Sequence, residues 1–184
     1  MKNKDRKLFL QVEYTHLENS EFEETMSEYK HEYMEDFSEE INFLMSTAPA
    51  KDETTVKEPE AKMSDQHPYF QSLYRSIAKI THPDKNNGDD EYFKKANTAY
   101  STGDWVELIT LCNELRIALP PIPDDVYEEI INCLKSIQES INSNKQSVAW
   151  VWGASDKSEQ VRDQIRKALG IDPELFEEWK RTKN

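Results

Sequence analysis

The pattern of apolar and polar residues predicts that most of the chain is helical. One apolar stripe recurs every three or four residues and consists of Phe22, Met26, Tyr29, Tyr33, Phe37, Ile41 and Leu44. Such spacing is typical of one face of a long amphipathic helix. Ser20 and Glu23 have the capping-box spacing, so we expect this helix to begin at Ser20. Residues 8–15 alternate more like a short strand, although a helical start there stays open.

In the middle of the chain, short helical patterns are separated by a predicted linker and predicted loops. From Ser46 to about Asp65 the composition turns to Pro, Ala, Thr, Lys and Glu, which indicates a linker. We then expect a helix over 68–81, a loop over 82–90 and a helix over 91–101. Gly103 suits the end of that helix, and Asp104 suits the cap of the next, which is predicted over 105–118, before the prolines at 120, 121 and 123.

The C-terminal part predicts further helices. A helix opened by Asp124 or Asp125 and ending near Asn144 has an apolar stripe at Val126, Ile130, Leu134, Ile137 and Ile141. Residues 147–152 form a compact apolar segment. Ser155 suits the cap of a helix ending at Gly170, and Asp172 precedes a last short helix.

The fold class predicted from these patterns is mainly α. The expected organisation is an acidic N-terminal segment with an amphipathic helix (1–47), a linker (48–65), a helical domain around the loop (66–118) and a C-terminal helical extension (119–184).

Charge and composition narrow the function classes. The formal net charge of the 184 residues is −13, which argues against a nucleic-acid binder, because such proteins neutralise phosphates with Lys and Arg. Residues 1–65 hold 17 acidic against 8 basic side chains, a net of −9, so the acidity is concentrated there. A run such as 18–40 is usually a solvated helix face, and a basic partner is the alternative.

The sequence also bears on location. No apolar run is long enough to cross a bilayer, and the first residues do not resemble a signal peptide, so we expect a cytoplasmic protein without a membrane partner. Cys112 and Cys133 lie far apart within helical patterns and lack zinc-type spacing, which favours buried thiols in a reducing compartment.

The loop at His82-Pro83-Asp84 lies between two patterned helices. In the first, Phe70, Leu73, Tyr74, Ile77 and Ile80 share an apolar arc, whereas Arg75 and Lys79 occupy the opposite side. No acidic residue occurs from Gln66 to Pro83, so this side is a local basic patch. In the second helix Phe93, Ala96 and Tyr100 share a face, and Lys94 and Lys95 point away. Packed antiparallel, the two helices would present the loop as an exposed tip.

These residues resemble the second and third helices of a J domain, the DnaJ-like co-chaperone family. The resemblance rests on Tyr74-Arg-Ser-Ile-Ala-Lys-Ile-Thr-His-Pro-Asp84, a short loop, and Phe93-Lys-Lys-Ala-Asn-Thr-Ala-Tyr100, and covers about residues 66–102. The flanking helices, with Trp150 and Trp152, loosely resemble extensions in small J-like proteins of bacterial and phage genomes.

The resemblance implies a co-chaperone that docks on a DnaK-type chaperone and stimulates its ATP hydrolysis, with no active site, cofactor or metal of its own. His82, Pro83 and Asp84 would be the signalling loop, and Arg75, Lys79 and Lys85 would meet an acidic surface of the chaperone. Leu73, Tyr74, Ile77, Phe93, Asn97 and Tyr100 would be the structural core of the helical pair.

The sequence departs from the family in one respect. The place of the usual first helix is taken by linker residues 57–66, so the helix from Ser20 to Leu44 or the helix after Asp124 would have to cover the same apolar faces. The Gly/Phe-rich segment and the cysteine cluster that some J proteins use for clients are absent from the sequence. A client or assembly partner would then bind through the N- or C-terminal helices.

The sequence also allows other interpretations. One is a structural or adaptor protein that uses the helical pair as an interaction module. Glu13-x-x-His16 and Glu28-x-x-His31 imitate di-iron motifs but lie close together, which favours coincidence. His82 and Asp84 imitate an acid and a base, yet no nucleophile or oxyanion loop accompanies them, which argues against an enzyme. Trp105, Trp150 and Trp152 are expected to pack in the core, with a partner-binding patch as the alternative.

Overall fold

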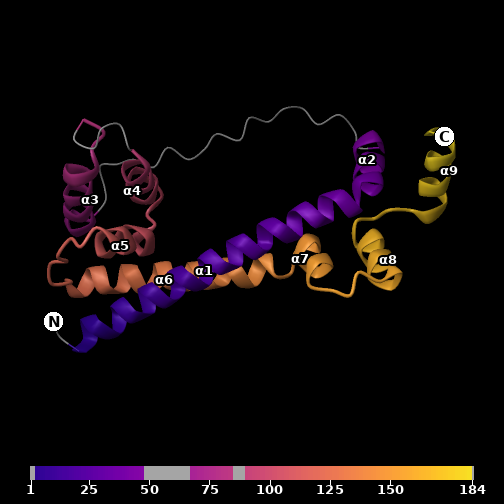
Figure 1. Cartoon of the computed structure of the whole chain (residues 1–184). Coiled ribbons are helices and arrows are strands. Elements are labelled where there is room, and N and C mark those ends of the chain that lie inside the picture. Colours follow the sequence, from indigo (N-terminus) through magenta and orange to yellow (C-terminus); the bar gives the residue numbers. More distant parts are fainter. Residues whose placement is uncertain (1–2, 48–66, 85–89, 184) are drawn as a thin grey trace. The chain divides into compact units, whose positions relative to one another are not determined.

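The computed structural model describes residues 3–47, 67–84 and 90–183, and in these ranges it contains helices and no strand. The predicted linker at 48–65 lies outside the described residues. The helices are α1 (Asn3–Asp36), α2 (Ser38–Thr47), α3 (Pro68–Thr81), α4 (Glu91–Thr102), α5 (Trp105–Glu114), α6 (Asp124–Asn144), α7 (Val148–Gly153), α8 (Glu159–Ala168) and α9 (Pro173–Lys183) (Figure 1). The all-helical class is therefore confirmed. None of the described helices is both long and apolar enough to cross a membrane.

Helix α1 is a single helix of 34 residues, so the predicted start at Ser20 and the strand at 8–15 were wrong, and the helical start left open for 8–15 is confirmed. The buried positions explain why. Leu8, Val12 and Thr15 are buried at steps of four and three residues, and Phe22 and Met26 follow on the same face after a step of seven, or two turns. One buried stripe therefore passes straight through the Ser20 capping box. A residue inside a continuous amphipathic helix has no unpaired amide groups to cap.

The described chain divides into two compact units that each draw on separate stretches. The first unit comprises residues 3–20, 67–84 and 90–140, and the second comprises residues 21–47 and 141–183. Helices α1 and α6 therefore contribute their first parts to one unit and their last parts to the other. These two units differ from the four consecutive segments predicted from the sequence, because each unit is assembled from separate stretches of the chain.

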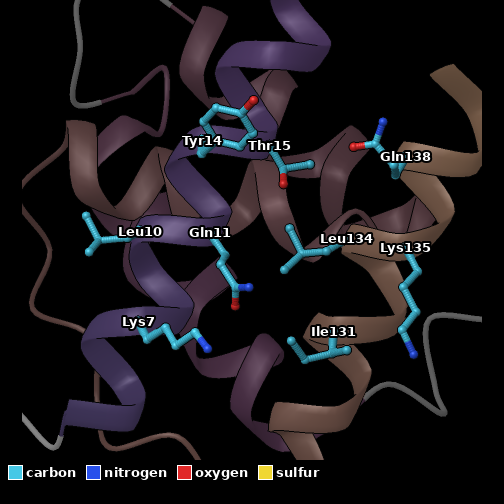
Figure 2. A pocket seen from close by; sticks show the side chains of 9 residues that line it. All are labelled: Lys7, Leu10, Gln11, Tyr14, Thr15, Ile131, Leu134, Lys135 and Gln138. Atoms are coloured by element: carbon cyan, nitrogen blue, oxygen red, sulfur yellow. The ribbon is translucent and has the colours of Figure 1, made fainter. Parts of the chain in front are cut away.

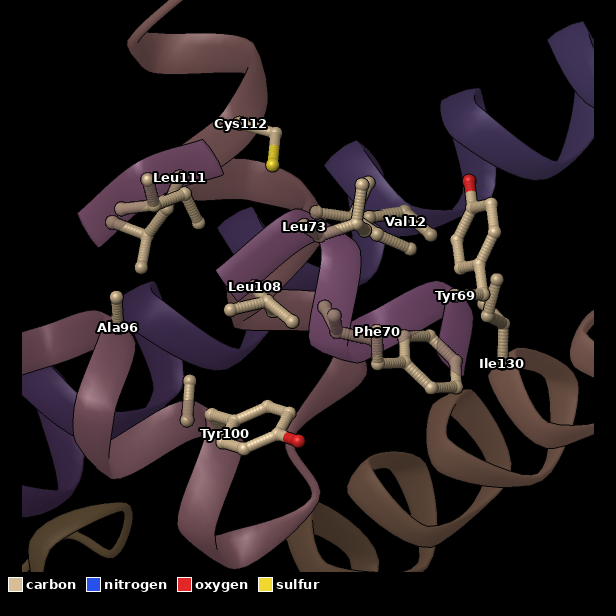
Figure 3. Close-up of a cluster of buried hydrophobic side chains, with 14 of the residues drawn as sticks. Val12, Tyr69, Phe70, Leu73, Ala96, Tyr100, Leu108, Leu111, Cys112 and Ile130 are labelled. Carbon is tan, nitrogen blue, oxygen red and sulfur yellow. The ribbon is translucent and has the colours of Figure 1, made fainter. Parts of the chain in front are cut away.

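The first unit has a continuous core to which α1, α3, α4, α5 and α6 all contribute (Figure 3). Several of its side chains are completely covered, among them Phe70, Ile77, Ala96, Leu108, Ile109 and Ile130. The small side chains of Ala96 and Ala99 let α4 approach its neighbours closely. Burying each of the larger groups contributes about 1.5–3 kcal/mol.

The helix boundaries in this unit follow local signals. Gly103 adopts the left-handed conformation at φ 75° and ends α4, and Asp104 Oδ1 accepts the amide hydrogen of Glu107 at 3.0 Å. Both predictions are confirmed. Helix α5, however, ends at Glu114 rather than 118, because Arg116 takes a positive φ of 55° and the Ile117 amide donates to Cys112 O at 2.8 Å. A non-glycine residue closes this helix, so the usual glycine signal was missing.

The second unit packs α1 and α2 against short C-terminal helices through aromatic contacts. Trp150 stacks on Phe22 with ring centroids 5.1 Å apart, and Trp152 meets Phe37 edge-on at 5.0 Å. The Trp152 indole also donates to Asp36 Oδ2 at 2.8 Å. These tryptophans therefore serve the packing predicted for them.

Helix α8 begins after Ser158, so the predicted cap at Ser155 was wrong. The Ser155 hydroxyl instead accepts the amide hydrogen of Lys157 and donates to Trp152 O at 2.7 Å, which closes the turn after α7. The left-handed conformation of Lys157, at φ 55°, ends that turn. Asp172 Oδ1 accepts the Glu174 and Leu175 amide hydrogens at the start of α9, as the sequence indicated.

A buried ion cluster joins α2 to α8 within the second unit. The Glu40 side chain is only 1% exposed, and its Oε1 accepts from Arg162 Nε at 3.0 Å and from Arg166 Nε at 2.9 Å. Arg162 also covers the Phe37 ring, with the guanidinium carbon 4.9 Å from the centroid. Glu40 belongs to the acidic run that the sequence assigned to solvent, and that assignment was wrong for this residue.

Candidate functional site

Helices α3 and α4 pack antiparallel, with the His82 loop at one end of the pair. The direction follows from the ring contacts, because residues later in α3 meet residues earlier in α4. Taken from the loop inward, His82 meets Phe93 at 5.4 Å, Tyr74 stacks on Tyr100 at 4.7 Å, and Phe70 stacks on Trp105, the first residue of α5, at 3.8 Å. The Tyr74 hydroxyl also lies 3.4 Å from Asn97 Oδ1, to which it donates.

The sequence His82-Pro83 determines where α3 ends and the loop begins. A residue before proline is kept out of the helical conformation, and His82 accordingly has φ −57° and ψ 132°. Its amide still donates to Ala78 O at 3.0 Å, so α3 ends at Thr81 and the Ala78 carbonyl keeps a hydrogen-bond donor. The Thr81 side chain is buried and donates to Ile77 O at 3.0 Å.

The residues His82, Pro83 and Asp84 are called the tip below; Asp84 is exposed, and His82 and Pro83 are half-buried. The side chains of His82 and Asp84 are 46% and 87% exposed. His82 Nδ1 accepts the Asp84 amide hydrogen at 3.3 Å, and the neutral ring then carries its hydrogen on Nε2. The tip therefore offers one donor on His82 and a carboxylate acceptor on Asp84. Lys85, the third basic residue predicted to bind a partner, lies outside the described residues.

The exposed side of α3 carries Arg75 and Lys79, as the sequence pattern indicated. Arg75 makes no ion pair within the described residues. In α4, Lys94 pairs with Asp90 at 2.9 Å and Lys95 pairs with Glu91 at 2.8 Å, each one turn away. Helix α3 contains no acidic residue, so its exposed side is positively charged.

The residues assigned to the core of the pair vary in burial. Leu73, Ile77 and Tyr100 are buried, Tyr74 and Phe93 are half-buried, and Asn97 is exposed. Ile80 was placed on the packing arc, but its side chain is exposed and Thr81 takes the buried position four residues after Ile77. A polar threonine does not contribute to a hydrophobic pattern, so the sequence assigned the buried position in this turn to Ile80. Ile80 is instead an exposed apolar side chain two residues from the tip.

Two other helices cover the apolar faces of the pair. Leu8 and Val12 from α1, and Val126 and Ile130 from α6, join the same buried core as α3 and α4. The prediction that the helix after Asp124 would contribute is confirmed. The other prediction named the helix from Ser20 to Leu44, whereas the contribution comes from the earlier part of α1.

No known protein family, curated protein or solved structure matches the chain.

The other residue patterns singled out in the sequence do not form a metal site. His16 pairs with Glu107 at 3.3 Å and His31 pairs with Glu35 at 3.4 Å, so the two Glu-x-x-His motifs have different partners. Throughout the described part of the chain, no group of three His, Cys, Asp or Glu side chains is close enough to share an ion. Cys112 is buried and Cys133 half-buried, and neither is in a disulfide.

Proposed function

We propose that the chain is a J-domain-like co-chaperone that docks on a DnaK-type chaperone of the heat-shock-70 class and stimulates its ATP hydrolysis through the tip. The observation that carries the proposal is the exposure of His82 and Asp84 at the end of an antiparallel helical pair whose outer face carries Arg75 and Lys79. The ATP site belongs to the chaperone, so this chain contributes contacts and no chemistry of its own.

The geometry of the tip supports a signalling contact. Pro83 restricts the backbone, and the Asp84 amide holds the His82 ring, so little side-chain freedom is lost when a partner binds. The His82 Nε2 donor and the Asp84 carboxylate give a partner two hydrogen-bond sites of opposite type. Both are set directly beside the end of α3.

The charge distribution supports an acidic docking surface on the chaperone. The whole chain carries −13, which repels an acidic partner at long range. At physiological ionic strength such repulsion is screened beyond about 8 Å, so the local charges of α3 decide the close approach. Arg75 and Lys79 are one turn apart on the exposed side and would steer the acidic surface toward the tip.

The steady-state ATPase rate of a DnaK-type chaperone from the same host tests the proposal. The wild-type protein should raise the rate, and His82→Gln should abolish the rise. His31→Gln is the matched control, because His31 is an exposed histidine of the second unit. Equal helix content by circular dichroism would show that each variant is folded. Stimulation that survives His82→Gln, or no stimulation of any host chaperone, would overturn the proposal.

A second variant tests the basic face separately from the tip. Arg75→Ala should raise the concentration needed for half-maximal stimulation by up to about fivefold, because one exposed ion pair contributes about 0.2–1 kcal/mol. The maximal rate should remain. Arg181→Ala in α9 is the control for loss of one exposed arginine. A stable stoichiometric complex that persists in Asp84→Asn would instead favour the structural or adaptor function.

A further inference from the structure

A groove of about 480 Å³ lies between the first part of α1 and α6, on different helices from the tip (Figure 2). The α1 wall is formed by Lys7, Leu10, Gln11, Tyr14 and Thr15, and the α6 wall by Ile131, Leu134, Lys135 and Gln138. All of these residues belong to the first unit. In Figure 2 the side chains of Gln11, Ile131 and Leu134 lie between the two helices.

The spacing of the lining residues matches the surface of a packed helix. On α1 they follow the steps i, i+3, i+4 and i+7 from Lys7, and on α6 they follow the same steps from Ile131. Two helices that present such faces side by side form a groove into which a third helix can pack. Seven residues of rise span about 10 Å, so about two turns of an incoming helix would lie in it.

The side of α1 that borders the groove exposes three large apolar side chains, two of which line the groove. Leu10, Tyr14 and Leu17 are 58%, 67% and 61% exposed, and they lie on one side of α1. They are three of the nine large apolar side chains that are exposed in the described residues. Single exposed apolar residues are normal, whereas a group of them on one face beside a groove favours a binding surface.

The charge of the groove specifies its partner further. Among the described residues, the charged side chains that line it are Lys7 on one wall and Lys135 on the other. Neither makes an ion pair within the described part of the chain. In a protein with 36 acidic side chains, a groove whose charged lining residues are both lysines complements carboxylates.

We propose that this groove binds an amphipathic helix of a protein partner whose apolar stripe is flanked by Asp or Glu. The stripe would pack on Leu10, Tyr14 and Leu134, and the flanking carboxylates would pair with Lys7 and Lys135. The partner is defined by this chemistry, and the proposal does not depend on the function of the tip.

Fluorescence anisotropy with three labelled synthetic peptides tests the proposal on the full chain. The first is a 16-residue helical peptide with leucines at i, i+3, i+4 and i+7 and flanking glutamates, the second has lysines in place of the glutamates, and the third is a scrambled sequence of the first. The glutamate peptide should bind about tenfold more tightly than the lysine peptide, because two ion pairs replace two repulsions. Equal binding of all three would overturn the proposal.

Variants then locate the bound peptide. Leu10→Asp should weaken binding by about tenfold or more, because a central apolar contact is replaced by a charge. Met34→Asp, an equally exposed apolar position later in α1, should leave it unchanged. The double change Lys7→Glu with Lys135→Glu should reverse the preference between the glutamate and lysine peptides. Unchanged binding by either groove variant would exclude this site.

Two further controls separate the alternatives. His82→Gln should bind the glutamate peptide like the wild type, so a failure of the ATPase experiment leaves this result intact. Sedimentation velocity reports whether the groove instead joins two copies of the chain. A dimer that Leu10→Asp dissociates, together with no peptide binding, would show that the occupant is a second copy and would refute the proposed partner.

Discussion

Replacing Glu40 by alanine removes the carboxylate that two arginines share inside the second unit. The Glu40 side chain is 1% exposed, and its Oε1 lies 2.8 Å from Arg166 Nη2 and 3.0 Å from Arg162 Nε. The arginines are themselves about three-quarters covered, with exposed fractions of 25% and 24%. The substitution would therefore leave two guanidinium groups with reduced solvation and a methyl group where their common partner stood.

The expected loss is about 3 kcal/mol in the free energy of unfolding. Breaking a buried ion pair by removing one partner usually costs about 3–5 kcal/mol. The lower end applies here because Arg166 keeps Glu159 and Asp163, and Arg162 keeps the Asp36 carbonyl. Because a domain has only about 5–15 kcal/mol of stability, this single change should be readily measured.

Urea unfolding followed by tryptophan fluorescence measures this loss. Glu39→Ala is the matched control, because Glu39 is the exposed neighbour in the same helix and should change stability by less than about 0.5 kcal/mol. Glu40→Gln keeps the shape and an acceptor oxygen, so it should fall between the two. A loss below about 1 kcal/mol for Glu40→Ala would refute the conclusion that the buried carboxylate holds α2 on α8.

The same cluster gives a pH dependence with a defined sign. Burial by itself raises the pKa of Glu40, but the hydrogen bonds from Arg162 and Arg166 outweigh it, so the pKa lies below its ordinary value. The carboxylate therefore stabilises the folded state above the pKa of an unfolded glutamate, about 4.3. This contribution is lost as the pH falls through the lower pKa of the folded state. Glu40→Ala should lack this acid-dependent loss in urea titrations at different pH.

Three further substitutions or reagents test other parts of the fold. Gly153→Ala should destabilise the second unit by about 1–3 kcal/mol in urea unfolding, because an added Cβ would clash with the Tyr29 side chain; an unchanged midpoint would contradict this packing. Gly103→Ala should cost about 1 kcal/mol because φ is +75°, whereas Gly103→Asn should cost less; equal losses would argue against a conformational cause. Burial raises the pKa of the Cys112 thiol to about 12, so iodoacetamide should label it only after unfolding, as mass spectrometry would show; labelling of native Cys112 would contradict its burial.

The local features of the fold were predictable from short stretches of sequence. Gly103, Asp104 and Asp172 act within a few residues of the helix ends they define, so their chemistry is legible without the rest of the chain. The same holds for His82 and Pro83, because the residue before a proline leaves the helix wherever the pair occurs.

Features that depend on distant residues were not predictable in this way. Glu40 lies in a run of acidic side chains, and nothing nearby indicates that Arg162 and Arg166, more than 120 residues later, surround it. Leu8 and Val12 likewise reach the core of the helical pair only through tertiary packing. At Ser20 a valid capping pattern was overridden, because a longer apolar stripe outweighed a local signal.

The end of α3 at Thr81 has a consequence for how this surface tolerates change in length. Each residue added to or removed from a helix turns everything beyond that point by about 100° and shifts it by 1.5 Å. A deletion between Lys79 and His82 would leave Arg75 in place but swing the tip to another side of α3. At this helix length the basic face and the tip therefore have a fixed relative orientation. Deleting one exposed residue there would move the tip off the side of α3 that carries the basic face.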